Sequence, residues 1–150
     1  MNFAVWLMTS WTTESATRLH NSPHLGVFYV TGGGNSLCND LLSVPGASST
    51  VLETSVPYAE TALADRLGGT PDQACSADTA RALAMAAWQR ARVLAPDTTI
   101  KHLFGLGCTA SLATNRVKRG DHRAHLAIQT INSTASLTVV FDKGTDGWGD

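Results

Sequence analysis

The sequence has little charge and no excess of either sign. Aspartate, glutamate, lysine and arginine make up 15% of the 150 residues, and the formal net charge is −1. Proteins that bind nucleic acid or an acidic membrane surface usually carry a clear positive excess. We therefore expect neither nucleic acid nor a membrane among the partners of this protein. The hydrophobic fraction of 43% is typical of a globular chain, and the length favours one domain.

Cysteine is also scarce, and its spacing excludes two kinds of site. Cys38, Cys75 and Cys108 are odd in number, and no two of them have C-x-x-C spacing. This argues against a disulfide framework or a zinc site and predicts reduced thiols. His122 and His125 have the spacing of a metal-binding pair, but on a strand they would point to opposite faces. We expect neither a metal nor a cofactor.

Long apolar runs and the standard nucleotide motifs are missing as well. No stretch approaches the roughly 20 apolar residues that cross a bilayer. The apolar start, residues 1–8, is short and has no basic residue before it, so we expect no signal peptide. Neither a complete P-loop nor a complete G-x-G-x-x-G pattern is present. We expect a cytoplasmic protein.

Hydrophobic patterning predicts strands that alternate with helices. The expected helices are 12–20, 36–42, 59–67 and 77–94, and the expected strands are 25–30, 50–56, 100–106, 124–130 and 137–141. This order predicts an α/β fold, a three-layer α/β/α sandwich whose mixed sheet ends in an antiparallel hairpin. We divide the chain into an N-terminal segment with a first helix (1–22), the domain (23–142) and a flexible tail (143–150).

A glycine-rich stretch, residues 30–35, joins the first expected strand to the second expected helix. Glycines at such a junction let the backbone approach a ligand closely, with helix N–H groups directed at it. A phosphate or a carboxylate would suit that arrangement. The same glycines would also suit a tight turn without any ligand.

Several short motifs, in order from about residue 23 to residue 130, resemble the C-terminal domain of the competence-damage protein CinA. This family includes the nicotinamide mononucleotide deamidases. Residues 28–33 stand where the family has E-S-C-T-G-G, residues 44–48 match V-P-G-S-S, and residues 58–63 match Y-S-N-E-A-K. Further along, residues 67–69 resemble L-L-G, residues 75–86 resemble V-S-E-E-V-A-x-x-M-A, and residues 105–109 stand where the family has G-I-A-G-P.

The resemblance implies a fold and an activity. It implies the fold of the CinA C-terminal domain and hydrolysis of the carboxamide of nicotinamide mononucleotide to the acid and ammonia. It also implies a serine nucleophile at Ser48, with Tyr58 in the same site. Thr31, Gly32 and Gly33 would help to bind the nucleotide.

Two departures from the family motifs put the chemistry in question. The lysine that would activate the serine is Leu63 here, and the serine of the first motif is Tyr29. A serine hydroxyl is a poor nucleophile without a base. If Ser48 attacks the carboxamide, the base must come from another residue, and the candidates are Tyr58, Lys118 and His122.

A basic stretch, residues 116–123, replaces the end of the last family motif. Its Arg119 and Arg123 would pair with the phosphate, and backbone N–H groups of Gly32, Gly33 and Gly34 would hold the phosphate or the oxyanion. Each of these features also has an ordinary interpretation. The basic stretch could be a solvated loop, Ser48 a turn residue and Tyr58 a packing residue.

These departures leave a second functional hypothesis open. The chain could be a non-catalytic nucleotide-binding module that has lost the family lysine at Leu63. The closing helix of the family has no counterpart in the sequence. A shortened domain would leave apolar sheet surface for a second subunit to cover, so we expect a homo-oligomer.

Overall fold

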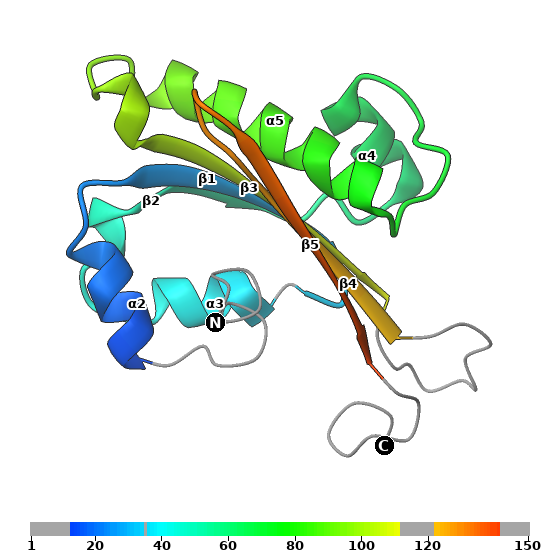
Figure 1. Cartoon of the computed structure of the whole chain (residues 1–150), viewed down its shortest axis with the longest axis horizontal. Coiled ribbons are helices and arrows are strands. Elements are labelled where there is room, and N and C mark those ends of the chain that lie inside the picture. The colour runs from blue at the N-terminus through cyan, green and yellow to red at the C-terminus, as the bar shows by residue number, and fades with distance from the viewer. Residues whose placement is uncertain (1–12, 35, 112–121, 142–150) are drawn as a thin grey trace.

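The structure of the chain is a computed structural model, which describes residues 13–34, 36–111 and 122–141. These residues form one sheet with layers of helices on its two faces (Figure 1). The α/β fold and the three layers that the sequence predicts are therefore confirmed. Lys118 and Arg119 and the expected tail, residues 143–150, lie outside the described residues.

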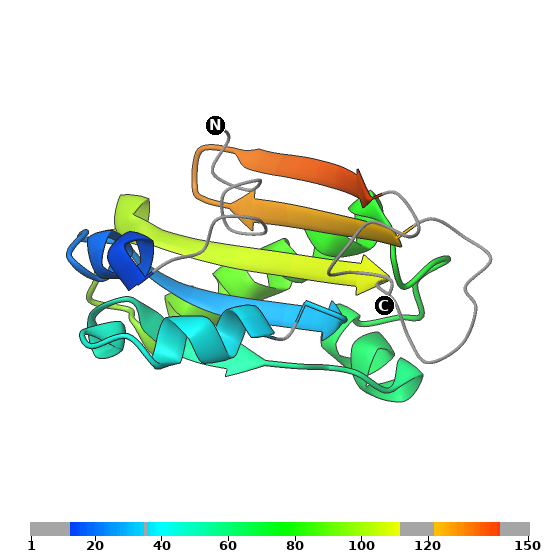
Figure 2. The same ribbon diagram turned by 90° about the horizontal axis from the view of Figure 1, so that it is seen from below.

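The sheet is mixed and has five strands in the order β2-β1-β3-β4-β5. β1 (Leu25–Gly32) runs parallel to both of its neighbours, β2 (Val51–Ser55) and β3 (Leu103–Ser111). β4 (His122–Gln129) and β5 (Thr134–Phe141) follow as antiparallel strands. The predicted closing hairpin is thus present, and the carboxyl ends of the three parallel strands lie at one edge of the sheet (Figure 2).

Two helices cover each face of the parallel part of the sheet. α4 (Glu60–Leu67) and α5 (Ala77–Leu94) lie on one face, and α2 (Thr13–His20) and α3 (Ser36–Leu42) lie on the other (Figure 1). A short 3-10 helix, η1 (Ala47–Ser49), leads into β2, and another, η2 (Ile100–His102), leads into β3. Gly68, with a φ of 79°, ends α4 in the left-handed conformation that favours glycine.

α5 packs unusually close to the sheet. Its N-cap Ser76 accepts a 3.1 Å hydrogen bond from the N–H of Thr79. Four alanines on its inner face are completely buried: Ala80, Ala84, Ala87 and Ala91. A Cβ atom on Gly105 or Gly107 would collide with the backbone of α5. Small residues on both sides therefore let the helix backbone approach β3.

The two faces of the sheet bury separate hydrophobic clusters. The cluster beneath α3 contains Phe28, Val30, Leu37, Cys38, Leu41, Phe104, Leu106, Cys108 and Leu126. The cluster beneath α4 and α5 contains Val27, Tyr29, Leu63, Leu83, Ala87, Trp88, Ala91 and Leu103. Successive residues of β1 alternate between the clusters, as expected for a strand that is buried on both faces.

Some predicted bounds were wrong. Residues 100–102 are a 3-10 helix, and the strand continues beyond its predicted end at residue 106 to Ser111. Gly105 and Gly107 serve the close approach of α5 rather than a turn. Both hairpin strands begin earlier than expected, β4 at His122 and β5 at Thr134. His122 and Arg123 therefore lie on a strand and not in the predicted basic loop.

The second face of the hairpin differs from the rest of the sheet. α5 contacts β4 and β5 on one face, whereas none of the described helices lies over the hairpin on the face that carries α2 and α3 (Figure 2). Among the described helices, none has both the length and the apolar character that crossing a membrane requires.

Candidate functional site

Most of the described site residues from the sequence prediction gather at the carboxyl edge of the sheet. Thr31 and the glycines 32–34 follow or end β1, and Tyr58 comes shortly after β2. His122 and Arg123 start β4, whose antiparallel direction brings its first residues to the same edge. At this edge β1 and β3 are neighbours, but the chain continues from β1 to β2 on one side of the pair and from β3 to β4 on the other side. Such switch points are where open α/β sheets usually bind ligands.

The glycine turn is shaped by its contact with β3. Gly32 has a φ of 79°, and a Cβ atom there would collide with the carbonyl of Ala110. The N–H of Gly33 donates a 3.0 Å hydrogen bond to the same carbonyl. A Cβ atom on Gly34 would lie 2.9 Å from the sulfur of Cys108. The glycines are therefore needed for packing, and the Gly33 N–H, which we expected to hold a phosphate or an oxyanion, is already used within the chain.

Thr31 connects the glycine turn to the segment after β2. Its side chain is buried, and the hydroxyl donates a 3.1 Å hydrogen bond to the carbonyl of Pro57. The next residue, Tyr58, is 75% exposed. Thr31 thus fixes the backbone next to Tyr58, whose ring stands free at the carboxyl edge. This exposure rules out the interpretation of Tyr58 as a packing residue.

His122 is the most unusual polar residue at this edge. It is only 4% exposed, and its buried Nδ1 atom has no hydrogen-bond partner among the residues that the structure describes. Buried polar atoms are nearly always paired, so an unpaired one needs an explanation. Its neighbour Arg123 is exposed and lies opposite Ser111 in the β3–β4 pairing. His122 and His125 are an odd number of positions apart on β4, so they point to opposite faces, as predicted.

Ser48 lies at the opposite edge of the sheet. It is exposed on η1, which follows Gly46 (φ 96°) and precedes β2. The five residues of β2 separate η1 from the segment that contains Tyr58, a span of roughly 16 Å for an extended strand. Within one chain, the structure therefore does not bring Ser48 to Tyr58, to the glycine turn or to His122.

The two residues that depart from the family motifs lie together in the core. Tyr29 on β1 is 1% exposed, Leu63 on α4 is 3% exposed, and both belong to the hydrophobic cluster beneath α4 and α5. Burial raises the pKa of the Tyr29 hydroxyl above its ordinary value, although the nearby Arg66 guanidinium acts in the opposite direction. The hydroxyl therefore stays protonated at neutral pH.

A polar network that the sequence did not reveal surrounds Tyr29. Its hydroxyl donates a 3.2 Å hydrogen bond to Glu53, and Arg66 donates one of 3.2 Å to the same hydroxyl. Glu53 also pairs with Arg90 of α5 at 3.2 Å. Only the position of Arg66, three residues after Leu63, could have suggested a shared helix face. Glu53 and Arg90 are too distant in the sequence for pattern reasoning.

The cysteines confirm one expectation and correct another. Cys38 and Cys75 were expected to be structural, and Cys38 is a buried free thiol whereas Cys75 is a half-buried one. Cys108, whose place in the sequence suggested a turn with a reactive thiol, is a buried free thiol as well. Cys108 lies on β3 and not in a turn, and burial raises the pKa of its thiol to about 12. It is therefore a poor candidate for a nucleophile. Within the residues that the structure describes, no group of three or more His, Cys, Asp or Glu side chains could hold a metal ion.

When this chain is compared with known proteins, similar proteins are found among the solved structures. No protein-family model and no curated protein matches the sequence. The competence/damage inducible protein CihA from Agrobacterium tumefaciens is 23% identical, with a TM-score of 0.60 over 85% of this chain and 78% of that chain. A competence-damaged protein (CinA) superfamily protein from Escherichia coli is 12% identical, with a TM-score of 0.63 over 95% of this chain and 81% of that chain.

A third structure gives the same result. The competence damage-inducible protein A (ComA) from Klebsiella pneumoniae is 14% identical, with a TM-score of 0.58 over 86% of this chain and 79% of that chain. The chain therefore has the fold of the CinA superfamily proteins. The resemblance that the short motifs predicted is confirmed at the level of the fold.

Proposed function

We propose that the protein is a divergent CinA-like domain that binds a pyridine nucleotide at the carboxyl edge of its sheet without hydrolysing it. The observation that carries this proposal is the packing of Tyr29 and Leu63. They stand where the family motifs have serine and lysine, and both are buried in one cluster. Leucine cannot take a proton, and the Tyr29 hydroxyl, whose pKa burial raises, is a proton donor at neutral pH.

His122 supports binding at this edge. Its buried Nδ1 has no partner among the described residues, and an unpaired buried polar atom costs about 1–3 kcal/mol. A polar group of a ligand would offset this cost by bonding to it. At the same edge the exposed ring of Tyr58 supplies a face for the pyridine, whereas the side chain of Arg123 points to the other face of β4 from that of His122.

Calorimetric titration with nicotinamide mononucleotide tests the binding. We expect the His122→Leu variant to bind about tenfold more weakly than the unchanged protein, because the ligand loses a buried hydrogen bond. His122→Asn keeps an amide near the position of Nδ1 and should retain more of the affinity. His24→Leu, an exposed histidine at the opposite edge, is the control. Equal affinity of His122→Leu and His24→Leu would contradict the role of His122.

The amidohydrolase with Ser48 as its nucleophile is a second candidate, and the geometry of β2 favours it in one respect. β2 is an edge strand, and Glu53 is its central residue. Ser48 and Tyr58 are equally distant from Glu53 along the chain. Two copies whose β2 strands pair antiparallel about Glu53 would place Ser48 of one copy opposite Tyr58 of the other. The catalytic site would then be complete only in a dimer.

Mixing two inactive variants tests this second candidate. Ser48→Ala and Tyr58→Phe should each abolish ammonia release from nicotinamide mononucleotide. Their mixture should recover about a quarter of the activity, because half of the dimers would be mixed and each would hold one intact site. A protein that sediments as a monomer, or a mixture without activity, would exclude the shared site.

A further inference from the structure

A separate hollow lies at the amino edge of the sheet, where α5 ends. Its volume is about 550 Å³, which is within the rough range of 300–1,000 Å³ for small-molecule sites. Three of its lining residues are polar and five are apolar: Gln89, Arg92 and Thr98, and Val93, Ala95, Pro96, Ile100 and Leu103. α5 has 18 residues and begins at the carboxyl edge, so this hollow is about 27 Å from that edge.

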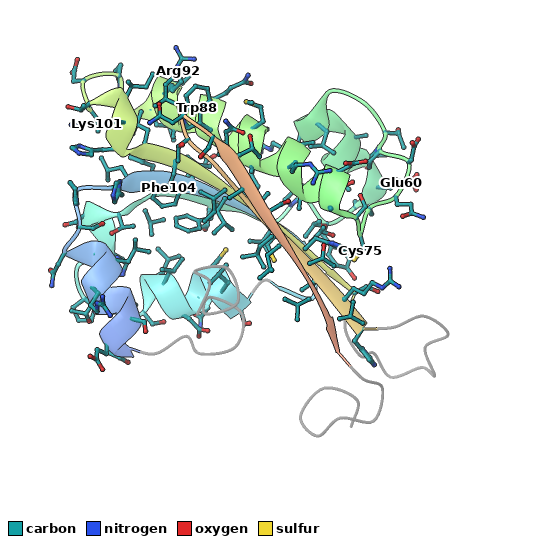
Figure 3. The ribbon with its side chains drawn as sticks, viewed as in Figure 1. Glu60, Cys75, Trp88, Arg92, Lys101 and Phe104 are labelled. Atoms are coloured by element: carbon teal, nitrogen blue, oxygen red, sulfur yellow. The ribbon has the colours of Figure 1, made fainter. Side chains whose placement is uncertain are left out.

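Arg92 is the charged group of this hollow. Its guanidinium carbon lies 5.0 Å from the centre of the Trp88 ring, a distance typical of a cation–π contact. In the part of the chain that the structure describes, Arg92 forms no ion pair. Trp88, Arg92 and Lys101 are found at one end of the molecule, and Glu60 and Cys75 at the other (Figure 3). The guanidinium is thus held on one face by Trp88, and its N–H groups remain available.

Among the charges near this hollow, the guanidinium of Arg92 dominates the electrostatic potential. Lys101 and Asp97 are exposed in the same connection between α5 and β3, and they have opposite signs. The last turn of α5 also carries the partial negative charge of its helix dipole, which the Arg92 guanidinium counteracts. An anion would therefore approach the hollow through the Arg92 side chain rather than through the helix end.

The apolar side of the hollow is open to solvent. Val93 is 68% exposed and Ile100 is 39% exposed, whereas Leu103, at 2%, forms part of the buried base. An isolated exposed apolar residue is ordinary, but here two of them flank a hollow that also contains an unpaired arginine. This combination matches a ligand with one negative end and one apolar end.

We propose that this hollow binds a small organic carboxylate with an aromatic or branched apolar body. Arg92 holds the carboxylate through two parallel N–H groups, as a guanidinium fork does. Val93, Ile100 and Leu103 cover the apolar body, and Gln89 and Thr98 are within the same lining for further polar contacts. The site is independent of the nucleotide site proposed for the carboxyl edge.

Titration with a matched pair of probes tests this site. 3-Phenylpropionate carries the carboxylate, and 3-phenylpropionamide has the same shape without the charge. We expect the carboxylate to shift the NMR amide signals of the last two turns of α5 and of η2, and to bind about tenfold more tightly than the amide. Trp88 gives a second readout, because an anion on Arg92 should change its fluorescence.

Variants of two of the three arginines of α5 complete the test. Arg92→Gln should abolish the preference for the carboxylate, and Arg92→Lys should keep part of it, because lysine retains the charge but not the fork. Arg81→Gln is the matched control, since Arg81 lies at the other end of α5 and pairs with Asp78. The site would be refuted by equal affinity for the two probes, by unchanged carboxylate affinity in Arg92→Gln, or by signal shifts confined to the carboxyl edge.

Discussion

The guanidinium of Arg66 covers the ring of Tyr29 and bonds to its hydroxyl. The guanidinium carbon lies 4.5 Å from the ring centre, and Nη1 donates a 3.2 Å hydrogen bond to the hydroxyl oxygen. Leu63, one turn earlier on α4, belongs to the same hydrophobic cluster as the ring. An aromatic ring, a leucine and a surface arginine thus form one packed contact between β1 and α4.

Removing the Tyr29 hydroxyl tests the role of this network in stability. Tyr29→Phe keeps the packed ring but loses the bonds to Glu53 and Arg66. We expect the free energy of unfolding in urea to fall by about 1 kcal/mol. Tyr58→Phe removes the same atom from a side chain that is 75% exposed, and it should have no measurable effect. Equal losses in the two variants would show that the network does not stabilise the fold.

The close packing of α5 on β3 predicts a sharp difference among glycines. Gly105→Ala and Gly107→Ala would place a Cβ atom against the backbone of α5, so we expect a loss of about 3 kcal/mol or failure to fold. Gly69→Ala is the control, because nothing lies within 4 Å of its Cβ position. Thermal unfolding measures all three variants. If Gly69→Ala were as harmful as the others, the contact with α5 would not be the cause.

The buried thiol of Cys108 predicts a loss of stability in alkali. Its pKa is raised from 9.0 to about 12, chiefly by burial, so above pH 9 the unfolded chain loses a proton that the folded chain keeps. The stabilisation that comes from keeping this thiol protonated is complete below about pH 9. As the pH rises toward 12, the free energy of unfolding falls by up to about 1.4 kcal/mol per pH unit. Urea unfolding at a series of pH values should show a smaller alkaline slope for Cys108→Ala. Identical slopes would contradict the shift.

The sequence predicts the fold better than it predicts the site. Periodicity and end signals located α3 and α5, because Ser76 caps a long run of alanines. They failed at Gly105 and Gly107, since glycine in a strand resembles glycine in a turn until the helix above is known. They also failed for Ser48, because spacing along the chain does not show that β2 carries the following residues to the opposite edge.

Local sequence also could not show how the glycines at the end of β1 are used. Between a strand and a helix they match both a ligand-binding turn and a packing turn. The contact of Gly32 and Gly33 with Ala110 depends on the pairing of β1 with β3. The burial of β4 also had to be known before the Nδ1 atom of His122 could be recognised as buried and without a partner among the described residues.

Binding without hydrolysis is tested most directly by incubating the purified protein with nicotinamide mononucleotide and measuring both ammonia release and the shift in melting temperature. We predict no ammonia above the level of a Ser48→Ala control, together with a rise in melting temperature that His122→Leu diminishes. Ammonia release that disappears in Ser48→Ala would contradict this prediction and would make the protein a serine-dependent amidohydrolase.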